Sequence, residues 1–264
     1  MIHITIADKP HEGLRVLKHS TERLGIDTRI HGLGTRQLIG HGKNGFGLKL
    51  SVLKEVVSAL PYEQFVLFTD AFDVIVQSSL DPLVEWLHGN QSVLFAAETT
   101  NWPDKTLQYP VPCGFIPFLN SGVFAGRAGH ILELLQQPFT STTDDQYYYA
   151  AQFVTGSSRI VLDSHAHYFL CFHGMPGDVA FKQEIEFIPA IGPPTRPAIL
   201  HFNNGKSRFV WYETCAAHVL GEWARAPARE VAYAVIPYWQ HRFRGIVCLF
   251  FLVLVIACVR DAIQ

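Results

Sequence analysis

Two aspartates, Asp70 and Asp73, lie three residues apart directly after the apolar run Phe65-Val-Leu-Phe68. Such a run is typical of a strand buried on both faces, and ligands of open α/β sheets bind beyond the carboxyl ends of the strands. Two carboxylates without a nearby lysine or arginine repel each other unless a cation lies between them. A hard divalent ion, Mg²⁺ or Mn²⁺, fits such a pair and would hold the phosphates of a nucleotide. In the alternative reading, Asp70 caps the following turn and Asp73 is solvated.

The elements that must position these aspartates alternate between strand-like and helix-like patterns, which predicts an α/β domain with a mixed, largely parallel sheet. A proline-rich stretch, residues 189–197, is expected to form a loop before the last strand. Strands are expected at residues 1–7, 65–68, 92–97, 122–125, 159–162 and 198–200, and helices at residues 12–24, 50–60, 83–87, 130–137 and 144–153.

The composition is that of a folded protein. Among the 264 residues, 48% are hydrophobic and 17% are charged, which excludes a disordered chain, a coiled coil or a collagen-like repeat. The formal net charge of -2 gives no positive field for nucleic acid, so none is expected as a partner. The five cysteines form no Cys-x-x-Cys pair, so they indicate neither a disulfide framework nor a thiolate zinc site.

The two ends of the chain differ in character. No charged segment precedes the first apolar run, so we expect no cleavable signal peptide, and the compartment stays undecided. Residues 246–259 are uninterruptedly apolar and would span about 21 Å as a helix, against about 30 Å for the hydrocarbon core of a bilayer. They are either a C-terminal membrane anchor or a buried or oligomer-forming helix. The expected division is therefore a domain of residues 1–225 and a linker with a hydrophobic segment at residues 226–264.

Five motifs follow one another along the chain. They are Phe68-Thr-Asp-Ala-Phe-Asp-Val74, Ala97-Glu-Thr-Thr-Asn-Trp-Pro103, Phe118-Leu-Asn-Ser-Gly-Val-Phe-Ala-Gly126, Asp144-Asp-Gln-Tyr147 and Leu200-His-Phe-Asn-Asn-Gly-Lys206. This series resembles the glycosyltransferase domain of the procollagen lysyl hydroxylases and its stand-alone relatives that glycosylate hydroxylysine. The likeness runs from about Ile2 to Tyr212. It implies a GT-A fold, a nucleotide-binding α/β sheet that uses a UDP-sugar and Mn²⁺.

The resemblance assigns the metal ligands residue by residue. It makes Asp70, Asp73 and His201 the ligands of Mn²⁺, with Mg²⁺ as a second candidate, and a neutral imidazole does complete an oxygen-rich site. A lone histidine at a strand end is otherwise more often a hydrogen-bonded structural residue. Phe72 matches an aromatic position that stacks on uracil in this family, and its alternative role is in the core.

Further nucleotide contacts are implied by the same resemblance. Lys49 matches the lysine after the family's glycine-rich loop and, as a point charge, suits a diphosphate; otherwise it is a solvated residue at a helix start. Asn203, Gly205 and Lys206 would hold the leaving UDP, or they form a simple turn, since their register with the family is loose by one residue. Thr5, on the first strand, completes the nucleotide-binding set, together with Asp70.

Asp144 and Asp145 stand where the family carries a longer acidic run beside the reacting sugar. Acidic residues in the first turn of a helix are also explained by the helix dipole alone. Asp145 is the better candidate for positioning the donor sugar or the acceptor hydroxyl, with a general-base role open to it. Asn120 would hydrogen-bond a sugar hydroxyl at the catalytic centre, or it closes a turn.

The acceptor side is represented by three residues. Gln146 would bind a sugar hydroxyl, or it caps a helix. Glu98 and Trp102 match a loop that the family places near the acceptor. Trp102 would stack on a sugar face, although an aromatic residue before Pro103 also serves packing.

One pattern suggests a rival function. In Leu162-Asp-Ser-His-Ala-His-Tyr168, His165 and His167 lie two residues apart, on one side of a strand, with Asp163 and His173 near in sequence. They suggest a second metal site and a zinc-dependent hydrolase, for which a third ligand is not evident.

Together these observations predict a metal-dependent glycosyltransferase that moves glucose or galactose from a UDP-sugar to hydroxylysine or galactosyl-hydroxylysine of a collagen-like protein. The family's hydroxylase half has no counterpart in this chain, so no lysyl hydroxylation is expected. A non-catalytic UDP-sugar-binding or membrane-tethered scaffold is the alternative, kept open by the thinned acidic run. A membrane, through residues 246–259, and a second copy of the chain are further candidate partners.

Overall fold

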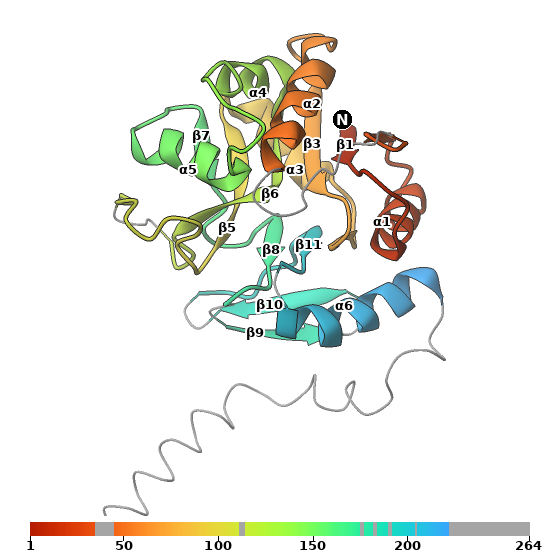
Figure 1. Ribbon diagram of the computed structural model, residues 1–264. Coiled ribbons are helices and arrows are strands. Elements are labelled where there is room, and N and C mark those ends of the chain that lie inside the picture. Colours follow the sequence, from red (N-terminus) through yellow and green to blue (C-terminus); the bar gives the residue numbers. More distant parts are fainter. Residues whose placement is uncertain are drawn as a thin grey trace, which may run out of the picture.

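The computed structural model describes residues 1–34, 45–110, 114–174, 177–181, 184–189, 192–203 and 205–221, with the backbone alone for residues 205–211. Its centre is a six-stranded sheet in the order β2-β1-β3-β6-β5-β7 (Figure 1). These strands are β1 (Ile2–Ile6), β2 (Thr28–His31), β3 (Phe65–Asp70), β5 (Val93–Glu98), β6 (Phe118–Arg127) and β7 (Ile160–Leu162).

The sheet is mixed because of one strand. β1 is parallel to β2 and β3, and β5 is parallel to β7, whereas β6 is antiparallel to both β3 and β5. The start of β6 therefore lies beside the carboxyl ends of its neighbours. Thr69 is paired with Val123, which brings the adjacent residues Asp70 and Gly122 to the same edge of the sheet.

Helices and a second, smaller sheet cover the two faces of the central sheet. The helices α2 (Phe46–Ser58), α4 (Ala128–Leu134) and α5 (Asp145–Val154) share one hydrophobic cluster with one face, where Phe68, Phe95, Phe124 and Tyr149 pack ring against ring. The other face packs on α1 (Glu12–Glu22), α3 (Asp81–Gly89) and the smaller sheet through a second cluster. Each strand at the centre of the sheet is thus buried on both sides, as its continuous apolar sequence predicts.

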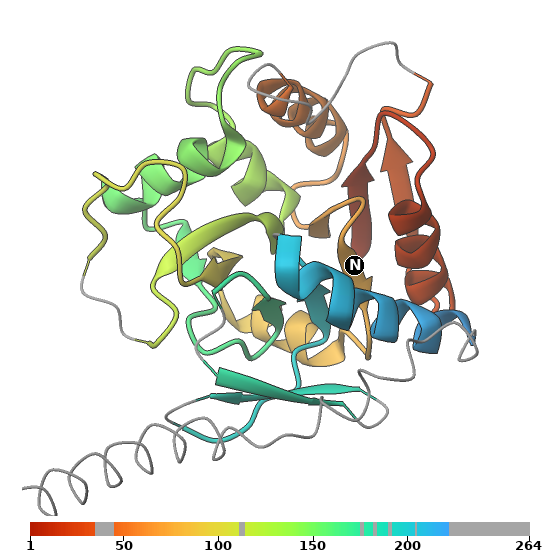
Figure 2. The ribbon, with the colours of Figure 1, turned by 60° about the horizontal axis from the view of Figure 1, so that its bottom comes forward.

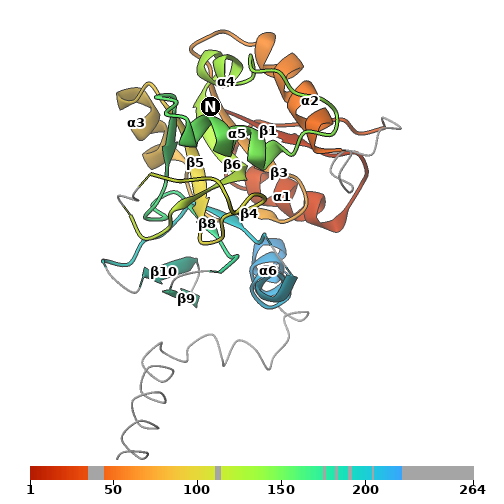
Figure 3. The same cartoon turned by 60° about the vertical axis from the view of Figure 1, so that its left-hand side comes forward.

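The smaller sheet has the order β4-β11-β8 and joins distant parts of the chain. β11 (Ile199–His201) is antiparallel to β4 (Val74–Val76) and parallel to β8 (Phe169–Cys171). A hairpin of β9 (Gly177–Phe181) and β10 (Ile185–Pro189) and the helix α6 (Gly205–Leu220) form the outermost layer, beyond β8 and β11 (Figures 2 and 3). The hairpin, α6 and β11 share a hydrophobic cluster.

The structure confirms the α/β class, and every strand and helix expected from the sequence is present with shifted ends. The sheet is less parallel than expected, since three of its five neighbouring pairs are parallel. The strands β2, β4, β8, β9 and β10 and the helix α6 were not expected. β10 occupies the first residue of the expected proline-rich loop, and Thr195 in that loop forms an isolated bridge with Phe187.

The predicted hydrophobic segment, residues 246–259, and the rest of the tail beyond residue 221 lie outside the described residues. Of the helices in the part of the chain that the structure describes, none has both the length and the apolar character needed to cross a membrane.

Candidate active site at the edge of the sheet

A cavity of about 420 Å³ opens at the edge where β3 and β5 end and β6 begins. Its walls come from α2, the β3–β4 turn, β5, β6, the first turn of α5 and the ends of β8 and β11. The lining residues are Phe46, Lys49, Asp70, Asp73, Glu98, Trp102, Asn120, Ser121, Gly122, Asp144, Asp145, Gln146, His173, His201 and Asn203. The cavity therefore collects most of the site residues predicted from the sequence.

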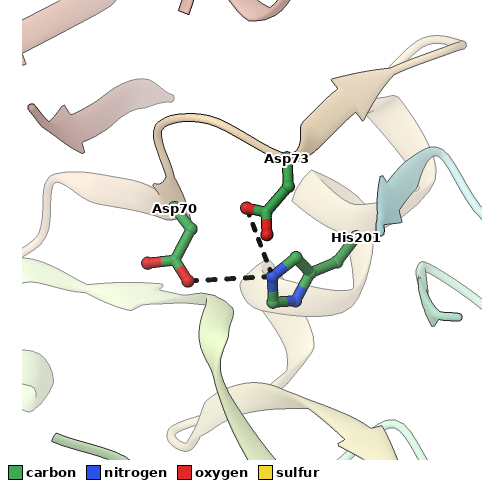
Figure 4. A group of neighbouring side chains, drawn as sticks. All are labelled: Asp70, Asp73 and His201. Atoms are coloured by element: carbon green, nitrogen blue, oxygen red, sulfur yellow. Dashed lines mark ion pairs between the residues drawn. The ribbon is translucent and has the colours of Figure 1, made fainter. Parts of the chain in front are cut away.

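Asp70, Asp73 and His201 converge on one point of this cavity (Figure 4). Nε2 of His201 lies 3.7 Å from Oδ2 of Asp70 and 3.6 Å from Oδ1 of Asp73. β3 ends at Asp70 and β4 starts one residue after Asp73, while β11 pairs His201 with Val74. One atom from each of the three side chains lies within 4.8 Å of the other two.

These three side chains fit a divalent metal. Burial raises the pKa of Asp70 above its ordinary value, against the opposing effect of Lys49. Burial alone would lower the pKa of His201, but the charge of Asp73 outweighs it and holds that pKa well above its ordinary value. Two carboxylates and one imidazole suit Mg²⁺, Mn²⁺ or Zn²⁺, so the donor set does not choose among these ions. It is the one cluster of at least three such groups in the described ranges.

Gly122 makes room for this cluster. A Cβ atom at that position would lie 2.2 Å from Cε1 of His201 and 2.8 Å from Oδ2 of Asp70. Two of the candidate ligands, His201 and Asp70, thus lie so close to the backbone of β6 that only glycine fits at position 122. The glycine of the Leu-Asn-Ser-Gly motif is a part of the site that the sequence analysis did not single out.

Lys49 occupies a position that its sequence context did not indicate. Its Nζ lies 2.7 Å from Oδ1 of Asp70 and 2.5 Å from Oδ2 of Asp145, with only 11% of the side chain exposed. Burial works against the charge of this lysine, but Asp145 and Asp70 outweigh it and raise the pKa of Lys49. The reading of Lys49 as solvated is therefore wrong, and so is the premise that no lysine lies near Asp70.

The two aspartates at the start of α5 have separate contacts. Asp144 caps the helix, since its Oδ1 accepts a hydrogen bond from the backbone N–H of Tyr147 at 2.8 Å. Oδ2 of Asp145 accepts a hydrogen bond from the Ser121 hydroxyl at 3.0 Å in addition to its pair with Lys49. Burial raises the pKa of Asp144.

Glu98 is the centre of a polar network on the opposite wall. It is 3% exposed. Oε1 accepts from the amides of Gln146 at 2.5 Å and Asn120 at 3.4 Å, and Oε2 accepts from Asn203 at 3.0 Å and lies 3.3 Å from Nδ1 of His173. This network is connected to the group of Asp70, Asp73 and His201.

Asn120 makes that link, because its Oδ1 lies 3.0 Å from Nδ1 of His201. With Nδ1 donating to this amide oxygen, Nε2 is the nitrogen of His201 that faces Asp70 and Asp73. Trp102 is also at the cavity, with 56% of its surface exposed and its carbonyl accepting from Gln146 at 3.1 Å.

Two predicted nucleotide contacts are not among the residues lining the cavity. Thr5 is fully buried and donates its hydroxyl hydrogen to the carbonyl of Thr69 at 2.9 Å, because its side chain points between β1 and β3. Phe72 is half-buried and lies against the His11 ring, with 4.6 Å between centroids. Gly205 begins α6, and the side chain of Lys206 lies outside the described residues.

The rival zinc site does not form in the described part of the chain. Asp163 is engaged by the backbone instead, since its carboxylate accepts hydrogen bonds from the N–H groups of His167, Tyr168 and Phe169. The rings of His165 and His167 are neighbours, with 5.6 Å between their centroids, but no third ligand joins them among the described residues.

Ser121, Gly122, Phe46 and His173 are the lining residues to which the sequence reading gave no part in this site. Ser121 and Gly122 belong to a motif quoted for its neighbour Asn120. His173 had been grouped with His165 and His167 because it is near them in sequence, but its contact is with Glu98 on β5.

Comparison with known proteins places this chain among glycosyltransferase domains. A protein-family model described as "PLOD GT domain" matches residues 1–223. The chain is 34% identical over 221 residues to procollagen-lysine,2-oxoglutarate 5-dioxygenase of Drosophila melanogaster, a match that covers 77% of this chain and 30% of that protein. It is 26% identical over 225 residues to the multifunctional procollagen lysine hydroxylase and glycosyltransferase of Caenorhabditis elegans, covering 79% of this chain and 31% of that protein. The chain thus spans less than a third of the length of these relatives.

A solved structure shares the fold. The galactosyltransferase LgtC, crystallised with donor and acceptor sugar analogues, superposes with a TM-score of 0.51 at 14% identity, covering 87% of this chain and 98% of that chain. At this level of identity the likeness supports a common GT-A fold.

Proposed function

Because the chain belongs to the PLOD GT domain family and is a glycosyltransferase, we propose that it transfers glucose or galactose from a UDP-sugar to an acceptor hydroxyl in a metal-dependent reaction. The observation that carries this proposal is the convergence of Asp70, Asp73 and His201 at one edge of the sheet. We propose Mn²⁺ as the ion.

The metal, when bound, would neutralise negative charge that develops on the UDP leaving group. Asp70 and Asp73 would hold it with carboxylate oxygens, and His201 would hold it through Nε2, since Asn120 engages Nδ1. Lys49 lies beside Asp70, so its ammonium is near the expected diphosphate and can add a charge-assisted hydrogen bond to it.

Roles for the remaining candidates follow from their contacts and from the family. Phe72 would stack on uracil, and Thr5 would act behind the nucleotide by holding β1 against β3. Asn203, Gly205 and Lys206 would contact the departing UDP.

Toward the sugar, Asp145 and Asn120 would orient the donor, with Asp144 fixing the start of α5. Gln146 and Trp102 would face the acceptor, whose sugar ring or side chain would lie on the exposed indole. Glu98 would position the amides of Gln146 and Asn120, from which it accepts hydrogen bonds.

We propose hydroxylysine or galactosyl-hydroxylysine of a collagen-like protein as the acceptor. The name of the Caenorhabditis elegans relative, which combines procollagen lysine hydroxylase with glycosyltransferase, supports this choice. Lysyl hydroxylation is not part of the proposal.

The proposal is tested by calorimetric titration of UDP with and without Mn²⁺. We expect Mn²⁺-dependent UDP binding by the unaltered protein and its loss in Asp73→Asn, which keeps the size of the side chain but removes its charge. Asp104→Asn is the matched control, since Asp104 does not line the cavity and its carboxylate accepts hydrogen bonds from the N–H and the hydroxyl of Thr106. Equal binding by Asp73→Asn and the unaltered protein would overturn the site assignment.

Turnover separates an enzyme from a scaffold that only binds. Release of UDP from UDP-glucose and UDP-galactose, each with Mn²⁺ and a hydroxylysine-containing collagen-like peptide, is expected for one of the two donors. Binding without release of UDP from either donor would favour the scaffold.

A further inference from the structure

His173 lies beside Glu98 in the wall of the cavity and has no role in the function described so far. It follows β8 by two residues, and its side chain is 31% exposed. Nδ1 lies 3.3 Å from Oε2 of Glu98, and no other hydrogen bond of the ring occurs within the described residues. The imidazole thus has one nitrogen fixed and one nitrogen available.

Glu98 fixes the tautomer of this ring. Its carboxylate is buried and accepts hydrogen bonds from three amides, so its contact with His173 is that of an acceptor. Nδ1 therefore carries the hydrogen, and Nε2 carries the lone pair. A carboxylate that orients an imidazole in this way prepares it to accept a proton.

The backbone of His173 is held as well. Its N–H donates to Oδ1 of Asn203 at 3.2 Å, and its carbonyl accepts from the Thr99 hydroxyl at 3.1 Å. Gly174 follows with φ of 61°, a conformation that favours glycine. The ring is consequently carried by a segment anchored to the ends of β5 and β11.

The aspartates of the cavity are engaged in other contacts. Asp145 shares one oxygen between the Lys49 ammonium and the Ser121 hydroxyl, so that oxygen is already engaged by two donors. Asp144 caps the first turn of α5. Asp70 and Asp73 belong to the metal cluster.

From these contacts we infer that His173 is the general base of the transfer, and this inference rests on the proposed function. Nε2 removes the proton of the acceptor hydroxyl while the acceptor oxygen bonds to the anomeric carbon of the sugar. The bond from that carbon to the UDP oxygen breaks, and its electron pair leaves with UDP. The imidazolium then releases its proton to water, to which the side chain is open.

The test measures transfer to a hydroxylysine-containing collagen-like peptide and, separately, hydrolysis of the UDP-sugar by water. His173→Gln can still donate a hydrogen bond to Glu98 but has no basic nitrogen. We expect its kcat to fall about 100-fold in both reactions, with little change in the KM for the donor. Calorimetric UDP binding with Mn²⁺ should be unchanged.

Imidazole rescue distinguishes a base from a structural residue. Added imidazole should restore the hydrolysis rate of His173→Ala by about tenfold and should have no effect on His173→Gln, whose side chain fills the space. His167→Gln is the matched control, because His167 is an exposed histidine that does not line the cavity, and it should retain full activity.

The inference is overturned if His173→Gln keeps more than half of the kcat, or if imidazole does not rescue His173→Ala. An unaltered protein that binds no UDP and releases none would overturn the proposed function, and this inference would fall with it. Normal transfer by both His173 variants would leave the proposed function intact and remove only the inference.

Discussion

At the scale of single residues, the site depends on the close packing of its charged side chains around Asp70. The carboxylate of Asp70 lies against the backbone at Gly122, beside the Lys49 ammonium and near the ring of His201. In the metal-free protein, Lys49 supplies the positive charge that the carboxylates of Asp70 and Asp145 need. Substitutions that alter shape, charge or hydrogen bonding can therefore be told apart by their effects.

Gly122→Ala tests the close approach. The new Cβ would meet Cε1 of His201 at 2.2 Å, so we expect Mn²⁺ binding to weaken by about tenfold or more through displacement of a ligand. Titration calorimetry with Mn²⁺ and UDP measures this change. Gly89→Ala is the control, because a Cβ added there would meet no atom within 4 Å, and it should bind as the unaltered protein does.

Glu98→Gln tests the network. The substituted side chain has one acceptor oxygen and one donor amide, so at least one of the present donors would face an N–H₂ group. We expect the free energy of unfolding to fall by about 1–3 kcal/mol, measured by urea denaturation. Glu186→Gln, which alters a surface pair with Arg196, should change it by less than about 1 kcal/mol. Equal losses in the two variants would contradict a central role for Glu98.

The sequence was sufficient to propose Asp70, Asp73 and His201 together, because each stands in a motif that resembles a known family. It could not assign the partners of Lys49 and His173. Their contacts, with Asp145 and Glu98, join side chains that are far apart in the chain and depend on tertiary packing. The contacts of Thr5 were out of reach for the same reason, since only the strand pairing shows which way its side chain points.

At the scale of elements, the direction of β6 decides where the site lies. Its apolar run predicts a strand, but the pattern contains no information on whether the strand is parallel to its neighbours. The strands β2 and β9 were missed because their half-buried residues lack a continuous apolar run. The strands β3 and β5, which are buried on both faces, were predictable from their continuous apolar sequences.

The strand β1 carries a buried histidine that should make stability depend on pH. His3 lies between the hydroxyls of Thr28 and Thr69, at 3.1 Å and 2.8 Å, and burial lowers the pKa of His3 from 6.5 to about 3. The folded protein therefore takes up this proton at a lower pH than the unfolded chain does. The stability that depends on neutral His3 is fully present above about pH 6.5 and is lost as the pH falls toward 3.

We expect the free energy of unfolding to decrease by up to about 1.4 kcal/mol per pH unit from this group between about pH 6 and pH 4. Urea denaturation of the metal-free protein at several pH values measures the slope. His3→Gln should be less dependent on pH by that amount, since burial also lowers the pKa of His31 and His130 but both remain in each protein. The same slope in both proteins would show that His3 is protonated in the fold.

At the scale of the whole molecule, the proposed metal joins two sheets. Asp70 ends β3 of the six-stranded sheet, whereas His201 ends β11 of the smaller sheet, and Asp73 lies in the turn between β3 and β4. A bound ion would therefore add a further link between layers that already contact each other through apolar side chains and through the hydrogen bond between Asn120 and His201.

Metal binding should accordingly stabilise both sheets together. At an Mn²⁺ concentration about 100 times the Kd, the free energy of unfolding is expected to rise by about 2.7 kcal/mol, and a chelator should reverse the gain. Hydrogen exchange should slow in β3 and β11 in parallel. Asp73→Asn should show neither effect, and protection confined to one sheet would contradict a bridging metal.

The long separation between Asp73 and His201 also has a consequence during translation. β3 and β4 leave the ribosome well before β11, which completes the smaller sheet between β4 and β8. A nascent chain that has not yet reached residue 201 contains Asp70 and Asp73 without the imidazole, and Lys49, the partner of Asp70 in the folded protein, has already been made. Loading with the proposed ion would therefore be a late event in biosynthesis, and ribosome-bound fragments ending before β11 should not complete it.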